Sequence, residues 1–258
     1  GFSGADLANV VNEAALLASR RQKPAVDMAD FDGAIERVVA GSERRTRVIN
    51  PQEKKIVAVH EAGHALVATL LPGTNAVHKV TIVPRGRALG YTWQRPAEDR
   101  YLMGERELHA QLAVLLAGRA AEALVFDEIS TGAADDLARA TDLARRMVSE
   151  YGMSPALGPV RLAAEPQASY LGGQGGLDAR VSPQTAATVD AETRQLVERA
   201  LTQAWELLNA RRPALDRLAA QLCEEETVDG EAVKALVPDT ATAPERTAPE
   251  LDGLLVHA

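Results

Sequence analysis

The sequence has one cysteine, few aromatic residues, no run of basic residues and no long apolar run. The single Cys223 excludes an intrachain disulfide and is typical of a reducing compartment. Phe, Trp and Tyr make up only 3% of the 258 residues, so the core must consist mainly of Ala, Leu and Val, which favours helices over a β-sandwich. A net charge of −8 without a Lys/Arg run argues against a nucleic-acid-binding surface. We find no uninterrupted apolar run of the roughly 20 residues that cross a bilayer.

The composition is otherwise ordinary for a soluble globular protein, with 46% apolar and 25% charged residues. The chain opens at Gly1 within a helical pattern, without an initiator methionine or a signal peptide, and we therefore interpret it as a fragment. We expect residues 1–41 to be the end of a truncated helical domain and 42–49 a polar linker. We expect residues 50–238 to form the second domain and residues 239–258, which are low in bulky apolar residues, to be a disordered tail.

Apolar residues recur at helical spacing through most of the chain, which predicts a mainly α fold with a small β-hairpin or sheet. Asn50 and Pro51 begin the most clearly marked helix, and Leu71-Pro72-Gly73 ends it. The segments VHKVTIVP and ALGYTW, at residues 77–84 and 88–93, are typical of strands. Further helices are expected at 4–21, 27–41, 105–125, 133–150, 184–211, 213–226 and 229–237, with a mobile Gly- and Pro-rich loop at 152–183.

The motif HEAGH, residues 60–64, lies inside the helix that begins after Asn50. His60 and His64 are four residues apart, so both imidazoles project from one side of the helix, at a spacing that lets both bind a single ion. The apolar residues Ile56, Val57 and Val67 fall within roughly 60° of His60, which predicts that the pair is buried. Two buried histidines with ordinary partners are the simpler alternative, but the intervening glutamate favours zinc.

Glu61 is rotated about 100° from the histidines and lies beside them. A catalytic zinc site uses three protein ligands and leaves a position for water, whose pKa the metal lowers to near 7. Glu61 is placed to take a proton from that water as it attacks a carbonyl. A closed structural site would instead need a fourth protein ligand and no such base.

The third ligand must come from a later helix, because position 70, where the metzincin motif has a histidine, is Leu70. On the expected 133–150 helix, Asp136 falls within the apolar arc, whereas Asp135 lies about 100° outside it and complements the helix dipole. A carboxylate on an apolar face is costly unless it is paired or binds a metal, which favours Asp136. Glu122, on the apolar stripe of the preceding helix, is the alternative ligand, or else the acceptor of a histidine N–H that fixes the tautomer. The arc of the 133–150 helix comprises Leu137, Ala140, Leu143, Ala144 and Met147.

From Gly1 to about Val237 the chain resembles the FtsH family of ATP-dependent zinc metalloproteases, which are AAA+ proteases of peptidase family M41. The start of the chain is similar to the end of the family's AAA+ lid, GFSGADLANVVNEAALLA. Successive motifs of the peptidase domain are matched by HEAGHALV, VTIVPRGRALGYT, LAGRAAEALVF and STGAADDLARATDLARRMV. Several extended motifs in the right order are far more specific than HExxH alone.

The resemblance implies that His60, His64 and Asp136 bind Zn²⁺, that Glu61 is the catalytic base of an endopeptidase, and that Glu122 orients a zinc histidine. Family members usually have Asn where this chain has Asp135. The resemblance also implies contact of the region around Gly4 and Ala5 with nucleotide. The chain lacks the pattern GxxxxGK[ST], so ATP and Mg²⁺ would act only through an ATPase core that this chain does not contain.

For the whole protein, the resemblance implies a homohexamer that degrades unfolded cytosolic and membrane polypeptides. It further implies transmembrane helices upstream of Gly1 and a location on the cytoplasmic face of the bacterial inner membrane, with this fragment itself soluble.

Two other interpretations of the sequence stay open at this point. The chain could be an oligomerisation or adaptor module whose zinc site is structural or degenerate. The segment ALGYTW is either an edge strand that pairs with an extended substrate or one strand of an ordinary hairpin. We expect the remaining histidines, His78, His109 and His257, to be surface or packing residues.

Overall fold

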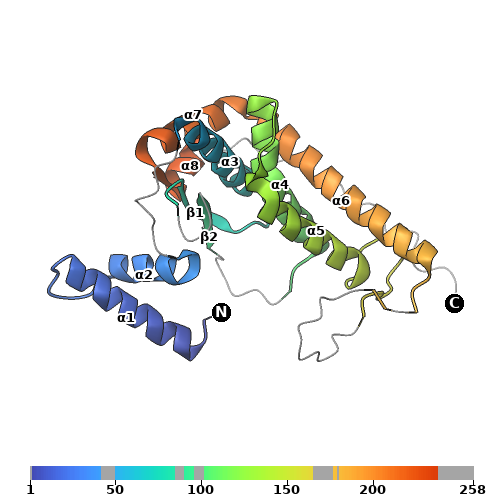
Figure 1. Ribbon diagram of the computed structural model, residues 1–258, viewed down its shortest axis with the longest axis horizontal. Helices are drawn as coiled ribbons and strands as arrows, with labels where there is room; N and C mark the ends of the chain where they lie inside the picture. The colour runs from blue at the N-terminus through green and yellow to red at the C-terminus, as the bar shows by residue number, and fades with distance from the viewer. Residues whose placement is uncertain are drawn as a thin grey trace.

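Helices form most of the protein, and one small sheet lies among them (Figure 1). The computed structural model describes residues 2–41, 50–84, 90–95, 102–164, 177–178 and 180–237. The expected linker at 42–49, the GGQGG part of the expected loop and the expected tail at 239–258 lie outside these residues. The elements are α1 Gly4–Arg20, α2 Met28–Ala40, α3 Pro51–Leu70, β1 Ala76–Thr81, β2 Tyr91–Arg95, α4 Glu105–Phe126, η1 Thr131–Ala133, α5 Ala134–Ser149, α6 Pro183–Ala210, α7 Arg212–Glu225, β3 Thr227–Asp229 and α8 Gly230–Leu236. The prediction of a mainly α fold is therefore confirmed.

Helices α1 and α2 form a separate pair beside the sheet (Figure 1). Ser3 and Asp27 cap the two helices through their side chains. A small cluster of Val10, Ala14 and Ala34 is buried between them. The pair is joined to the rest of the protein by an ion pair in which Lys79 Nζ of β1 lies 2.9 Å from Glu36 Oε1 of α2.

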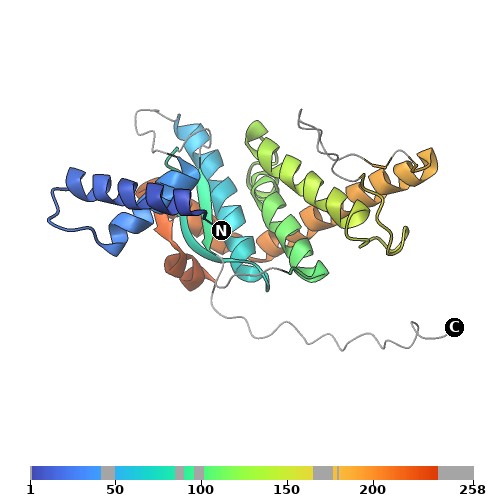
Figure 2. The same ribbon diagram turned by 90° about the horizontal axis from the view of Figure 1, so that it is seen from below.

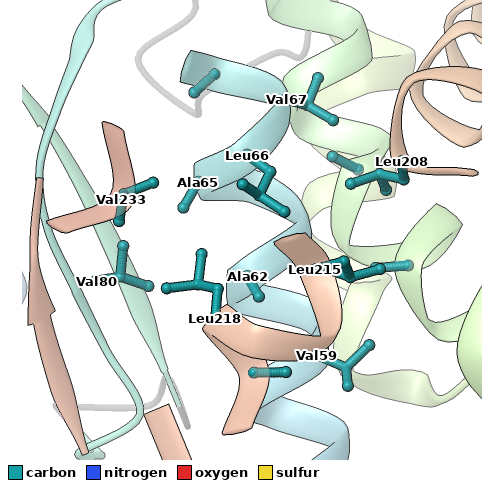
Figure 3. Packing of buried hydrophobic residues seen from close by; sticks show 14 of the residues in the cluster. Val59, Ala62, Ala65, Leu66, Val67, Val80, Leu208, Leu215, Leu218 and Val233 are labelled. Carbon is teal, nitrogen blue, oxygen red and sulfur yellow. The ribbon is translucent and has the colours of Figure 1, made fainter. Parts of the chain in front are cut away.

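Helix α3 is the centre of the remaining structure, because every residue from Ala58 to Ala68 is buried. Leu66 of α3 belongs to an apolar cluster that also contains Leu208, Leu215 and Leu218 of α6 and α7, and Val80 of the sheet (Figure 3). Helix α4 runs beside α3, and α5 and α6 lie beyond it (Figure 2). A second apolar cluster joins α4, α5 and α6, and its largest fully buried members include Leu112, Leu116 and Met147.

The sheet has three antiparallel strands in the order β2-β1-β3 within the described residues. Residues Val80 and Thr81 of β1 lie opposite Thr92 and Tyr91 of β2. The first strand ends at Thr81 rather than near Pro84, and the second continues to Arg95, while Ala88 and Leu89 lie outside the described residues. The third strand was not predicted, because three residues are too few for an alternating pattern.

Helix α4 is the one described helix that is long and apolar enough, by length and composition, to cross a membrane. It passes that criterion although Arg119 and Glu122 interrupt its apolar residues. Of its most apolar window, 61% is buried inside the protein, between α3, α5 and α6. The helix therefore has the properties of a core helix in this fold.

Candidate metal centre

The histidines of HEAGH lie in the buried middle of α3. His60 and His64 are each 8% exposed, and their rings meet edge to face with centroids 4.7 Å apart. Their Nε2 atoms are only 3.0 Å apart. Two imidazole nitrogens that approach each other with lone pairs would repel, so this arrangement requires a proton or a cation between them.

The opposite ring nitrogens are held by α4. His60 Nδ1 donates to Glu122 Oε1 at 2.6 Å, and His64 Nδ1 donates to the main-chain oxygen of Val114 at 2.7 Å. A carbonyl oxygen can only accept, so Nδ1 of His64 has a proton and is not the atom that would bind a metal. Both rings therefore present Nε2 as the atom free to bind a metal.

Glu122 lies on the far edge of the His60 ring from the other histidine. It is 1% exposed, as its place on the α4 stripe predicted. Its second oxygen, Oε2, accepts a 2.6 Å hydrogen bond from the main-chain N–H of Ser130, which the sequence did not reveal. Because it contacts Nδ1 and not Nε2, its position suits an orienting group better than a third ligand.

Gly118 of α4 allows the His60 ring to lie directly against that helix. A Cβ atom at position 118 would be 2.5 Å from His60 Nε2 and 2.6 Å from Nδ1. Real Cβ atoms do not make such contacts, so any larger residue would have to displace the ring.

Asp136 comes to the histidine pair from the first turn of α5. Its Oδ2 lies 3.3 Å from His60 Nε2 and 3.3 Å from His64 Nε2. Asp135 is exposed, as its position outside the apolar arc predicted. Leu137 was placed within that arc but is 38% exposed, because α5 buries a narrower stripe than we expected.

The three donor atoms fit a tetrahedral Zn²⁺ ion. Zinc bonds of 2.0–2.1 Å in a tetrahedral arrangement place neighbouring ligand atoms about 3.3 Å apart. The separations here are 3.0, 3.3 and 3.3 Å. Among the residues that the structure describes, these three form the one group with metal-binding spacing. Three ligands leave the fourth tetrahedral position open.

The charges around the histidines favour a cation at this point. Burial alone would lower the pKa of His60, but the carboxylates of Asp136 and Glu122 outweigh it and raise the pKa to about 10. Burial likewise opposes ionisation of Asp136, but the two histidines hold its pKa well below the usual range. The pKa of Glu122 is also lowered, because the bonds from His60 and Ser130 outweigh burial.

Glu61 is 7% exposed and faces the sheet. Thr92 Oγ1 of β2 donates to Glu61 Oε2 at 2.7 Å. Burial raises the pKa of Glu61, against the lowering effect of His64, His60 and the Thr92 bond. The contact with Thr92 was not predicted, because no sequence pattern specifies which strand residue lies over a given helix residue.

The remaining predicted residues lie away from this centre. Gly4 and Ala5 form the exposed first turn of α1. The ring of His78 packs edge to face on Trp93, and His109 Nε2 lies 3.6 Å from Glu105 on the same helix. His257 lies outside the described residues.

Comparisons with known proteins agree with this geometry. The profile of peptidase family M41 matches residues 47–236, and that of the AAA+ lid domain matches residues 1–33. The ATP-dependent zinc metalloprotease FtsH 4 of Synechocystis sp. is 53% identical over 239 residues, covering 92% of this chain and 38% of the relative. The FtsH of Methylococcus capsulatus is 50% identical over 243 residues, which cover 94% of this chain and 38% of that protein.

The chain thus spans less than two fifths of the length of these relatives, and the M41 match includes the whole metal centre. The family match thus agrees with the meeting of the histidine pair and the aspartate of α5 in one centre. This chain belongs to peptidase family M41.

Proposed function

We propose that this chain is the peptidase part of an ATP-dependent zinc endopeptidase. His60, His64 and Asp136 bind Zn²⁺, Glu61 is the general base, and Glu122 orients His60. The observation that supports this most directly is the meeting of the three donor atoms within 4.8 Å of one another. Glu61 is close enough for the charges of the same three residues to affect its pKa.

Each side chain of the centre has a separate role in peptide hydrolysis. A bound Zn²⁺ would supply the Lewis acidity that acidifies a water molecule and polarises the scissile carbonyl. Glu61 accepts the proton of the attacking water and delivers it to the departing amine nitrogen, which leaves the new carboxyl group on the other product. Glu122 accepts a hydrogen bond from Nδ1–H of His60, which keeps the proton on Nδ1 and leaves Nε2 of the neutral ring as the ligand atom.

The whole protein has further properties that we infer from its relatives. Residues 1–41 are the end of an AAA+ lid, and 50–238 are the peptidase domain. Gly4 and Ala5 lie near the nucleotide that an ATPase core outside this chain binds with Mg²⁺. The parent forms a homohexamer that is anchored in the bacterial inner membrane, and its peptidase sites act on unfolded polypeptides at the cytoplasmic face. The AAA+ lid match and the names of the relatives, which are ATP-dependent zinc metalloproteases, support the ATP-dependent part of this assignment.

Cleavage of casein by the full-length protein, with and without a metal chelator, tests the activity. Glu61→Gln should keep its zinc and lose cleavage. Asp136→Asn should lose zinc and activity together, whereas the neighbouring Asp135→Asn should keep both. Zinc retained in an Asp136→Asn enzyme of normal activity would contradict the ligand assignment. Zinc bound by a protein that cleaves nothing would instead favour a structural site in an adaptor module.

A further inference from the structure

The carboxylate of Glu61 is held by the sheet rather than by its own helix. In the described part of the chain, the one hydrogen bond to this carboxylate comes from Thr92 Oγ1 to Oε2, at 2.7 Å. The same hydroxyl lies 3.4 Å from the main-chain oxygen of Glu61. A threonine hydroxyl has a single proton, and the shorter distance shows that the carboxylate receives it.

The register of the sheet fixes the direction of the Thr92 side chain. Thr92 of β2 lies opposite Val80 of β1. Residues directly opposite each other on antiparallel strands have their side chains on the same face of the sheet. Val80 is fully buried and points toward α3 (Figure 3), so Thr92 also faces α3. Strand pairing thus places the Thr92 side chain on the face of the sheet from which its hydroxyl contacts Glu61.

The backbone just before Thr92 confines the other carboxylate oxygen. A Cβ atom at Gly90 would be 2.7 Å from both Cγ and Oε1 of Glu61. The start of β2 therefore lies directly against the side chain, with Oε2 bonded to Thr92 and Oε1 left without a bond from that hydroxyl. A general base has to be held within a fraction of an ångström of its productive position, which is what these two contacts provide.

We propose that Thr92 is a positioning residue that holds Glu61 through Oε2 and leaves Oε1 for proton transfer. The proposal rests on the general-base role of Glu61 in the proposed function. Because β2 is an edge strand of the described sheet, the position of the base then depends on the position of that edge. A contribution from Thr92 to catalysis should therefore appear in kcat and not in zinc binding.

Two pairs of variants that differ mainly in the hydroxyl group test this role in the full-length protein. Thr92→Val should lower kcat for a quenched fluorescent peptide by about 10- to 100-fold, with KM within twofold and unchanged zinc content. Thr92→Ser should restore most of the activity, and Thr92→Ala should lose it again. The Ser and Ala pair repeats the comparison in case valine disturbs folding.

Thr81→Val is the matched control. Thr81 is a buried threonine of the neighbouring strand that bonds to Thr227 Oγ1 at 2.8 Å and to the main-chain oxygen of Glu226 at 3.1 Å. Its loss should leave kcat within twofold of the wild type. A structural effect of any lost hydroxyl in this sheet would lower kcat in both valine variants and would overturn the proposal.

A double variant separates the positioning role from the proposed function itself. If Thr92 acts through Glu61, Thr92→Val should not lower any residual activity that zinc-loaded Glu61→Gln retains, whereas it lowers the activity of the wild type. A wild-type kcat in Thr92→Val, beside an inactive Glu61→Gln, would overturn only the positioning role. Full activity in zinc-loaded Glu61→Gln would overturn the proposed function.

Discussion

Zinc binding to the metal-free protein should release about one proton at neutral pH. His60 has a pKa of about 10 without metal, because Asp136 and Glu122 face its two ring nitrogens at 3.3 and 2.6 Å. At pH 7 the ring is therefore neutral in only about one molecule in a thousand. Zinc requires the neutral form and has to replace the proton at Nε2.

Zinc affinity should fall as the pH falls, because the pKa of His60 is raised. Each unit by which the pH falls below about 10 makes the neutral ring about tenfold rarer, so zinc affinity should fall about 100-fold between pH 8 and pH 6. Titration calorimetry in two buffers of different ionisation enthalpy measures the proton release, and competition with a zinc-binding dye measures the affinity at each pH. Asp135→Asn is the control, because this exposed carboxylate should leave both values unchanged. An affinity that changes less than threefold over this range, without proton release, would refute the reasoning.

Three further changes test the surroundings of the metal centre. Gly118→Ala should lose most of its zinc by elemental analysis, because the new methyl group displaces the His60 ring, while Gly104→Ala, where a Cβ atom meets nothing within 4 Å, should keep it. Glu122→Gln should weaken zinc binding by about 10- to 100-fold in a dye competition assay, because an amide is a poorer acceptor for the His60 proton. Leu66→Ala should reduce the free energy of unfolding by about 2–5 kcal/mol in urea titrations, since this fully buried side chain belongs to the main apolar core around α3. A loss below 1 kcal/mol would show that the core closes over the gap.

Much of the fold was predictable because most helix ends carry local information. Asn50 and Pro51 set the start of α3, and Asp27 that of α2, through side chains that act within one turn. Strand β3 had no such information, because its three residues gain their structure from pairing with β1, which is about 145 residues away in the sequence. Local rules cannot supply a contact of that range.

In the metal centre, too, some features follow from local sequence and others depend on how the helices pack. The 100° rotation between neighbouring helix residues separated Asp135 from Asp136, and the four-residue spacing paired the two histidines. The third ligand could be chosen only between Asp136 and Glu122, since both lie on apolar stripes. The structure places Glu122 at the opposite edge of the His60 ring. Which edge it takes depends on how α4 crosses α3, and no periodicity within one helix determines that.

The donor atoms of the centre come from separate helices, with Asp136 76 residues beyond His60 in the chain. Only folding brings Asp136 to the histidine pair, so an unfolded copy lacks the assembled set of three donor atoms. Under the proposed function, each copy would therefore become an active peptidase only by folding, because folding itself brings the three donor atoms together.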